Sequence, residues 1–185
     1  MRTFIAIPIP EECQRMLGKL QDNLRACRAD VRYVKPVSIH LTLKFLGEVD
    51  PEIVPELATS LENAIQTQDG FNLLLGGLGC FPNHRSPRII WCGIEAETEN
   101  LLRLQQQVEA TCEAHGFPAE DRVFHPHLTL GRVKGKRNLQ ALSDCIKMGS
   151  DLECRLRVDH FNIYQSTLKP QGAVYTVLKT IPLGE

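Results

Sequence analysis

Two copies of the tetrapeptide His-Leu-Thr-Leu, at residues 40–43 and 127–130, are separated by almost half of the 185-residue chain. A given four-residue string occurs at on the order of one position in 10⁵ at average composition, so chance does not account for the repeat. Each copy carries an imidazole that can give or take a proton near neutral pH and, two residues later, a hydroxyl. Residues i and i+2 of a strand point to the same side, so each copy predicts a strand face with a histidine and a threonine, backed by two core leucines.

Two such faces, brought together, would hold a phosphate between two histidines. Hydrolysis of a cyclic phosphodiester requires a base that deprotonates water on one side of phosphorus and an acid that protonates the departing oxygen on the other. His40 and His127 suit these tasks because an imidazole pKa of ~6.5 lies close to working pH. Thr42 and Thr129 would bind the non-bridging oxygens. This scheme requires no metal or other cofactor, and it predicts a bell-shaped pH profile.

Two basic residues beside the repeats are further candidates for binding the phosphate. By strand alternation Lys44 shares the face of His40 and Thr42, so it either adds positive charge to the site or is solvated at the strand end. Arg132 follows the second repeat, and it either binds a phosphate oxygen or pairs with a neighbouring carboxylate. The residue pattern leaves both choices open.

The bulk composition is that of an ordinary globular protein, with 43% hydrophobic and 23% charged residues. A formal net charge of −1 argues against coating of long nucleic acid, which relies on many Lys and Arg, but not against a site for one terminal phosphate. The apolar runs are far shorter than a membrane helix requires, and the N-terminus reads as a strand rather than a signal peptide. We therefore expect a cytoplasmic, compact monomer that does not contact membranes.

The cysteines are dispersed, and no two of them form a C-x-x-C pair. An odd, scattered set in a chain of this size is typical of reduced thiols, and most of these cysteines occupy apolar positions. We therefore expect buried thiols that bind no metal and form no disulfide. The seven are Cys13, Cys27, Cys80, Cys92, Cys112, Cys145 and Cys154.

Hydrophobic periodicity predicts alternating strands and helices along the chain. Helices are expected to begin at Glu11, after Asp50-Pro51 with Asp50 as N-cap, near Thr98 and near Leu139. Strands are expected at residues 2–8, 39–46, 71–75, 88–94, 127–133, 153–165 and 174–180.

This order of elements predicts a duplicated organisation. It reads β-α-β-α-β and then β-α-β-α-β-β, and each half carries its repeat on the strand that follows its first helix. No Gly-, Ser- or Pro-rich linker separates the halves, roughly 1–85 and 86–185, so we expect one bilobal domain over 1–185 rather than two independent units. The expected fold is α+β: two pseudo-symmetric lobes of antiparallel-rich sheet with helices outside and the active-site cleft between the lobes.

The strings HLTLKFLG at 40–47 and HPHLTLGR at 125–132 resemble the two-histidine (2H) phosphoesterases. Within this superfamily the sequence is most similar to the bacterial and archaeal RNA 2′,3′-cyclic phosphodiesterases, long called 2′-5′ RNA ligases. The similarity runs nearly end to end, from RTFIAIPIP near the start to YQSTLKPQGAVYTVL near the end.

The resemblance implies metal-free opening of RNA terminal 2′,3′-cyclic phosphates to 2′-phosphates, with small cyclic nucleotides as further possible substrates. It assigns His40 as proton donor and His127 as proton acceptor, with Thr42 and Thr129 as phosphate ligands; the near-symmetry of the repeats means that the residues alone do not distinguish donor from acceptor. Tyr33 stands where the family often has Trp, and its ring either stacks on a base or packs in the fold.

Three other functions are compatible with parts of the pattern. Ligation of RNA through a 2′-5′ bond is the reverse chemistry and would use the same histidines. A non-catalytic nucleotide-binding module would need the threonine hydroxyls but not two titrating imidazoles, so the presence of both histidines favours turnover. A metal-binding role for the six histidines finds little support, because none shows H-x-x-x-H spacing.

Overall fold

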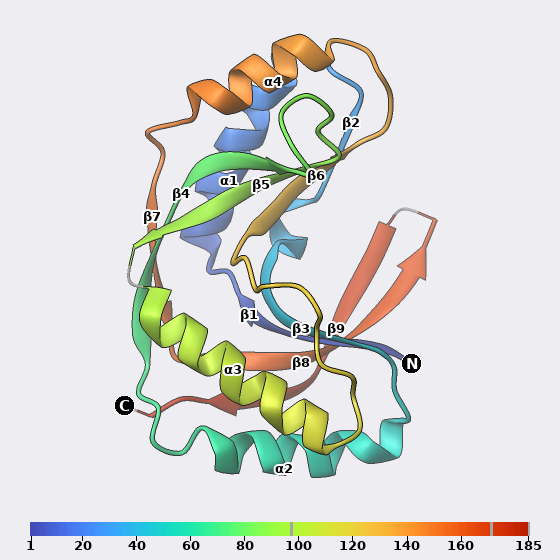
Figure 1. Cartoon of the computed structure of the whole chain (residues 1–185), viewed down its shortest axis with the longest axis vertical. Coiled ribbons are helices and arrows are strands. Elements are labelled where there is room, and N and C mark those ends of the chain that lie inside the picture. The colour runs from blue at the N-terminus through green and yellow to red at the C-terminus, as the bar shows by residue number, and fades with distance from the viewer. Residues whose placement is uncertain (97, 171, 185) are drawn as a thin grey trace.

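The structure is a computed structural model that describes residues 1–96, 98–170 and 172–184. Strands and helices alternate along most of this chain (Figure 1). The helices are α1 (Glu11–Arg25), α2 (Val54–Ala64), α3 (Thr98–Ala114) and α4 (Leu139–Met148), with short 3₁₀ helices at Pro36–Ser38 and Pro51–Ile53. The strands are β1 (Arg2–Pro8), β2 (Val31–Tyr33), β3 (His40–Glu48), β4 (Phe71–Phe81), β5 (Ile89–Ala96), β6 (Leu128–Val133), β7 (Cys154–Val158), β8 (His160–Lys169) and β9 (Gly172–Pro182).

The strands form two antiparallel sheets, each of which draws strands from both halves of the chain. The first sheet has the order β3-β1-β8-β9 and the second the order β2-β6-β5-β4-β7. On one side the repeat strands have equivalent neighbours: β3 pairs with β1 and β1 with β8, while β6 pairs with β5 and β5 with β4. On the other side β3 is an edge, whereas β6 also pairs with β2. The outer partners β8 and β4 each come from the opposite half. The expected α+β fold with antiparallel sheets is confirmed.

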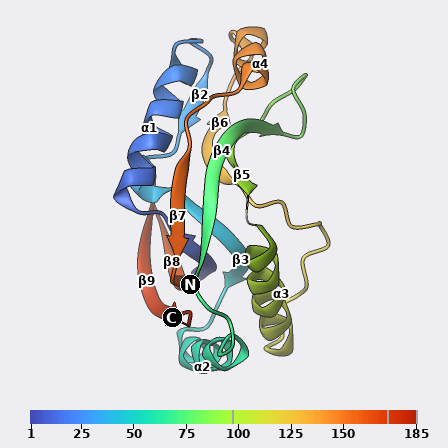
Figure 2. The same cartoon turned by 90° about the vertical axis from the view of Figure 1, so that its left-hand side faces the viewer.

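The helices cover one side of each sheet. α2 and α3 pack on each other and against β9 and β3 of the first sheet, whereas α1 packs against β7 and α4 against β4 of the second. Figure 2 shows α1 and α4 at one end of the molecule and α2 and α3 at the other. In α1 the buried residues Leu17, Leu20 and Leu24 recur at helical spacing. No helix in the described ranges has the length and apolarity that crossing a membrane requires.

Three elements differ from the sequence prediction. The strand predicted over 153–165 is two strands in different sheets, β7 and β8, because the chain leaves the strand geometry at Asp159. The short strand β2 is absent from the sequence prediction and forms by pairing with β6. Asp50 does act as a cap, since its side chain accepts the backbone N–H of Glu52, but it caps the 3₁₀ turn that precedes α2.

A disulfide joins Cys13 to Cys154, which contradicts the expectation that no disulfide forms. Cys13 lies on the buried face of α1 and Cys154 begins β7, against which α1 packs. Their Cα atoms are 5.5 Å apart although the two residues are 141 positions apart in sequence, so only the packing of α1 on β7 reveals the pair. The other five cysteines are free thiols, and burial raises the pKa of Cys92 and of Cys112 to about 12, as expected for packing residues.

Candidate active site

The two repeats lie on strands that contact each other although they belong to different sheets. The first repeat begins β3, the second leads into β6, and β3 contacts β6. In both repeats the two leucines are buried, while the histidine and the threonine remain partly exposed. The predicted alternation therefore holds within each repeat, and tertiary packing brings the two repeats together.

A β-bulge in β3 reverses the face of Lys44. The register of β3 against β1 passes from Thr42 directly to Lys44, so Leu43 is the extra residue. Because a bulge exchanges the faces of the residues that follow it, Lys44 leaves the face of His40 and Thr42. The expectation that Lys44 shares their face is wrong, since strict alternation does not continue across the bulge.

Lys44 is instead buried against α3. Its Nζ donates to Glu109 Oε1 at 2.5 Å and to the Pro118 carbonyl at 2.8 Å. The same Glu109 oxygen accepts the backbone N–H of Glu120 at 2.8 Å. Lys44 therefore anchors the segment that runs from α3 to His127, and it adds no free charge to the site.

A matching bulge in β6 has the opposite consequence for Arg132. The register of β6 against β5 skips Leu130, which is the equivalent residue of the second repeat. Arg132 consequently shares the face of Thr129, whereas strict alternation would turn it to the other face. The spare carbonyl of Leu130 accepts the Val34 N–H and the Gln21 side-chain amide, both at 2.9 Å, which stabilises the bulge.

Arg132 is exposed and lies near side chains of both sheets. Burial lowers the pKa of His127 and raises that of Tyr175 on β9, and the positive charge of Arg132 acts to lower both. Across the described ranges no carboxylate forms an ion pair with Arg132, so the alternative of a carboxylate partner is not what the structure contains. Its guanidinium is available to an anionic ligand.

The two histidines are held in the same way. His40 Nδ1 lies 3.1 Å from the Ser38 carbonyl, and His127 Nδ1 lies 2.6 Å from the His125 carbonyl. A carbonyl only accepts, so each Nδ1 carries the hydrogen, and in the neutral ring Nε2 has the free lone pair. In each repeat the carbonyl two residues earlier therefore fixes the ring and leaves Nε2 without a part in that hydrogen bond.

Both imidazoles have lowered pKa values. Burial lowers the pKa of His40 from 6.5 to about 4, against a smaller opposing effect of the hydrogen bond to Ser38. Burial also lowers the pKa of His127, to which the charges of His125 and Arg132 contribute in the same direction. Both rings are therefore neutral at neutral pH before an anion binds.

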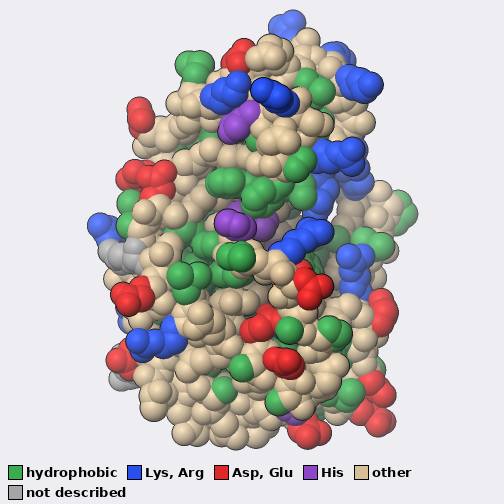
Figure 3. Space-filling model, in the orientation of Figure 1, with side chains coloured by type: hydrophobic (Ala, Val, Ile, Leu, Met, Phe, Trp, Pro, Cys, Tyr) green, Lys and Arg blue, Asp and Glu red, His purple; other side chains and the backbone are tan. Residues whose placement is uncertain are grey.

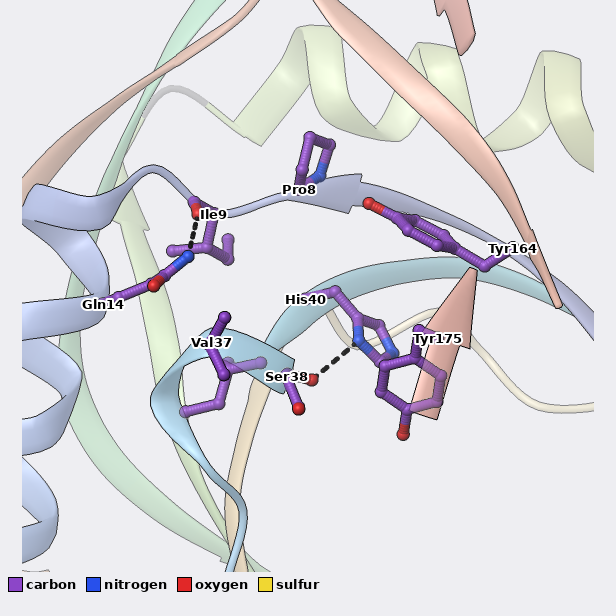
Figure 4. Close-up of a pocket in the computed structure, with 9 residues that line it drawn as sticks. Pro8, Ile9, Gln14, Val37, Ser38, His40, Tyr164 and Tyr175 are labelled. Carbon is purple, nitrogen blue, oxygen red and sulfur yellow. Dashed lines mark hydrogen bonds between the residues drawn. The ribbon is translucent and has the colours of Figure 1, made fainter. Parts of the chain in front are cut away.

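Aromatic side chains enclose His40. Phe4 stacks on its ring with centroids 4.6 Å apart, and Tyr175 meets it edge-on at 5.0 Å. A cavity of about 140 Å³ opens beside the ring, with Tyr164 on its wall as well (Figure 4). These rings are the physical cause of the low pKa, because they displace the water that would solvate an imidazolium.

His127 has its own aromatic neighbours on the second sheet. Phe81 meets its ring edge-on with centroids 5.1 Å apart, and Trp91 lies at 6.5 Å. Trp91 is also the register partner of Thr129, which places these residues on one face. In Figure 3, histidine side chains lie at the centre of the molecule among hydrophobic side chains, with Lys and Arg side chains beside them.

The threonine hydroxyls are available to a ligand. Considering the described residues only, neither Thr42 nor Thr129 has a protein hydrogen-bond partner for its hydroxyl. Nowhere in the described part of the chain do three or more His, Cys, Asp or Glu side chains gather as metal ligands would. The polar groups of the site are thus imidazoles, hydroxyls and a guanidinium.

Sequence reasoning missed several residues that border the site. Arg32 is paired with Arg132 in the β2–β6 register, and Tyr175 reaches His40 from β9. No local pattern marks either residue, because Arg32 is placed by the pairing of β2 with β6 and Tyr175 by the pairing of β9 with β8. Tyr33 lies on the other face of β2 and packs against the core, with the Arg25 guanidinium 4.4 Å from its ring centroid, so the packing alternative is the one observed.

A family model described as LigT-like phosphoesterase matches residues 7–91 and again residues 93–175. Each match contains one repeat, as expected for a duplicated chain. The chain therefore belongs to the LigT-like phosphoesterase family, and the resemblance to 2H phosphoesterases predicted from its repeats is confirmed.

Curated relatives and solved structures are similar over nearly the whole chain. The RNA 2′,3′-cyclic phosphodiesterase of Thermotoga maritima is 35% identical over 181 residues, covering 96% of this chain and 93% of the relative. That of Methanocaldococcus jannaschii is 36% identical over 180 residues, covering 97% and 99%. Among structures, TT0787 of Thermus thermophilus superposes with a TM-score of 0.81 at 33% identity, covering 100% of both chains. Escherichia coli LigT complexed with 3′-AMP superposes with a TM-score of 0.79 at 28% identity, covering 100% of this chain and 98% of that one.

Proposed function

We propose that this protein hydrolyses the 2′,3′-cyclic phosphate at RNA 3′ ends to a 2′-phosphomonoester. The observation that carries the proposal is the equivalence of the two histidines. Each donates Nδ1–H to the carbonyl two residues earlier and has Nε2 free. His40 begins β3, and His127 immediately precedes β6, which contacts β3. Relatives named RNA 2′,3′-cyclic phosphodiesterase, similar over nearly the full chain, support the same reaction.

In the proposed reaction, Nε2 of His127 takes a proton from water while the water oxygen attacks phosphorus. The bond from phosphorus to the 3′ oxygen breaks, and that oxygen takes the proton from Nε2 of His40, which leaves the phosphate on the 2′ oxygen. Thr42, Thr129 and Arg132 bind the non-bridging oxygens and stabilise the charge that develops on them. The two histidines thus exchange protonation states in one turnover, and solvent restores them.

The lowered pKa values of the two imidazoles fit a site in which the proton donor gains its proton when the substrate binds. In the free protein burial favours two neutral imidazoles, which suits His127 as a base. An anionic phosphate beside His40 favours the imidazolium, so binding raises the pKa of the donor and loads it with the proton that it gives away.

The test uses a short RNA that ends in a 2′,3′-cyclic phosphate, incubated with the protein in EDTA. Phosphorus NMR follows loss of the cyclic signal and identifies the phosphomonoester. We expect the wild type to form the 2′-phosphate, and we expect His40→Ala and His127→Ala each to slow the reaction at least ~10²-fold, the scale of general acid or base catalysis.

His115→Ala is the matched control, because His115 bonds to Ser60 at 2.9 Å outside the site and its loss should leave turnover unchanged. Absence of turnover by the wild type, with binding of the RNA end retained, would contradict hydrolysis and favour a nucleotide-binding module. Full activity of either site variant would contradict the two-histidine mechanism.

A further inference from the structure

Two arginines lie directly opposite each other on the site face of the second sheet. The register of β2 against β6 pairs Arg32 with Arg132, and both side chains are exposed. Directly opposed residues of antiparallel strands place their Cβ atoms about 4.5–5.5 Å apart, and like charges in this arrangement are destabilising. Within the described ranges neither guanidinium has a carboxylate or hydrogen-bond partner. The pair is a double positive charge that the fold does not neutralise.

The pair sits between the second sheet and the β8–β9 hairpin of the first. A Cβ on Gly172, at the start of β9, would lie 3.7 Å from Nη2 of Arg32, so this guanidinium reaches the tip of the hairpin. Arg132 acts electrostatically on His127 of its own sheet and on Tyr175 of the hairpin. Arg132 is therefore next to the reacting groups, and Arg32 lies one strand farther out.

The bulge at Leu130 is what creates this arrangement. It turns Arg132 onto the face of Thr129, and the register then places Arg32 beside it. A continuous strand would have pointed both arginines into the apolar layer under α1, where Val31 and Tyr33 pack. The irregular pairing at Leu130 therefore directs the side chains of both arginines toward the site.

We propose that Arg32, beside Arg132, forms a second anion subsite that binds the phosphodiester on the 5′ side of the terminal nucleotide. This inference rests on the proposed function, and it adds that the protein distinguishes an RNA end from a free cyclic mononucleotide. The cyclic phosphate at the histidines carries one negative charge. The next negative charge of an RNA chain lies one ribose away from this phosphate. Arg32 has a corresponding position, because it lies one strand beyond Arg132. A guanidinium suits this task because its planar fork donates two parallel hydrogen bonds to phosphate oxygens.

The test compares substrates that differ at one linkage. They are ApA with a terminal 2′,3′-cyclic phosphate and the same dinucleotide with an uncharged methylphosphonate linkage, with adenosine 2′,3′-cyclic phosphate as the reference that lacks the linkage. For the wild type we expect kcat/KM to be about 10–100-fold higher for the charged dinucleotide than for the neutral one, the fold-change typical of a charge-assisted hydrogen bond. In Arg32→Gln this ratio should fall toward one.

Arg25→Gln is the control for loss of a positive charge. Arg25 lies over Tyr33 on the other face of β2 and pairs with Asp22, so the variant should keep the wild-type ratio. A second readout is the salt dependence of KM for the charged dinucleotide. Its log–log slope should decrease by about 0.7 in Arg32→Gln, the contribution of one contact to single-stranded nucleic acid.

Two results would overturn the subsite: a wild type that does not distinguish the charged from the neutral linkage, or an Arg32→Gln variant that retains the distinction. If the wild type hydrolyses none of the substrates, the proposed function fails and the subsite is judged by binding alone. Calorimetry with 3′-phosphorylated ApA and its methylphosphonate analogue then decides. A preference for the charged linkage that disappears in Arg32→Gln supports the subsite, and no preference overturns it.

Discussion

At the residue scale, two chemically identical side chains have different surroundings. His40 is enclosed by the rings of Phe4 and Tyr175, whereas His127 is less buried and is close to the charge of Arg132. Their orientation is nevertheless the same, because the carbonyl two residues earlier holds Nδ1 in both. Two imidazoles that act as one acid and one base must be oriented alike but have different surroundings, and His40 and His127 meet both requirements.

This difference predicts a measurable titration. In the free protein the imidazole of His40 should titrate with a pKa of about 4, well below the usual 6.5, because burial disfavours its charged form. The ring is then protonated only below this pH, and the proton is lost as pH rises through it. Added orthophosphate or 3′-AMP should raise the pKa, since an anion favours the imidazolium.

Proton–carbon NMR of the Hε1 resonances as a function of pH measures both values, and His40→Asn assigns the signal. The Hε1 chemical shift of His115, which bonds to Ser60 outside the site, should not change when phosphate is added. A His40 resonance that titrates near 6.5 in the free protein, or that does not respond to phosphate, would contradict the proposed charging of the donor.

At the element scale, two bulges at the same residue of each repeat act on basic residues at different positions, Lys44 directly after the bulge in β3 and Arg132 two residues after it in β6. In β3 the bulge turns Lys44 away from the site into the contact with α3, and in β6 it turns Arg132 toward the site. The residue directly after the bulge turns away from the site in both strands. In β6 it is Gly131, where an added Cβ would lie 2.8 Å from Cγ1 of Val31 on β2 and would displace that side chain. In β3 it is Lys44, which extends from this edge strand to Glu109 on α3.

The Lys44–Glu109 contact should matter for stability and for the position of His127. Lys44→Met leaves the Glu109 carboxylate without its cation, and because only 20% of the Glu109 side chain is exposed, we expect the free energy of unfolding to fall by about 3 kcal/mol. Lys44→Met/Glu109→Leu should regain most of this loss, because both charges are removed together. Urea unfolding measures both variants.

The anchored segment leads to His127, so the folded Lys44→Met variant should also show a shifted His127 Hε1 resonance. Lys35→Met, at an exposed position, is the matched control and should change neither measurement. A double variant no more stable than the single one would show that the contact is not a coupled pair.

At the scale of the whole molecule, neither half of the chain contains a complete sheet. The first sheet takes β1 and β3 from the first half and β8 and β9 from the second, and the second sheet takes β2 and β4 from the first half. The disulfide between Cys13 and Cys154 also joins the two halves. Each sheet therefore depends on strands from both halves of the chain.

We propose accordingly that residues 1–185 fold as one unit, and we predict that residues 1–85 and 86–185, produced separately, show no cooperative unfolding. The full chain should show one transition, with the same urea midpoint by far-UV circular dichroism and by fluorescence of Trp91, the single tryptophan, which reports on the second sheet. A cooperative transition in either half alone, or two different midpoints in the full chain, would contradict a single folding unit.

The local features of the chain were predictable from the sequence. The doubled repeat, the strand face shared by His40 and Thr42, and the buried leucines behind them depend only on period-two alternation. The helices follow from apolar spacing, as in α1, and the α+β class follows from the order of elements. Each of these depends on residues a few positions apart.

What the sequence alone determined is thus the chemistry that each repeat offers and the elements that carry it. Tertiary structure alone decided which side chains meet: that Lys44 turns away and Arg132 turns in, that Arg32 lies beside Arg132 and Tyr175 meets His40, and that Cys13 bonds to Cys154. The physical reason is that bulges, strand register and helix–sheet packing are set by partners far apart along the chain, and local periodicity carries no information about those partners.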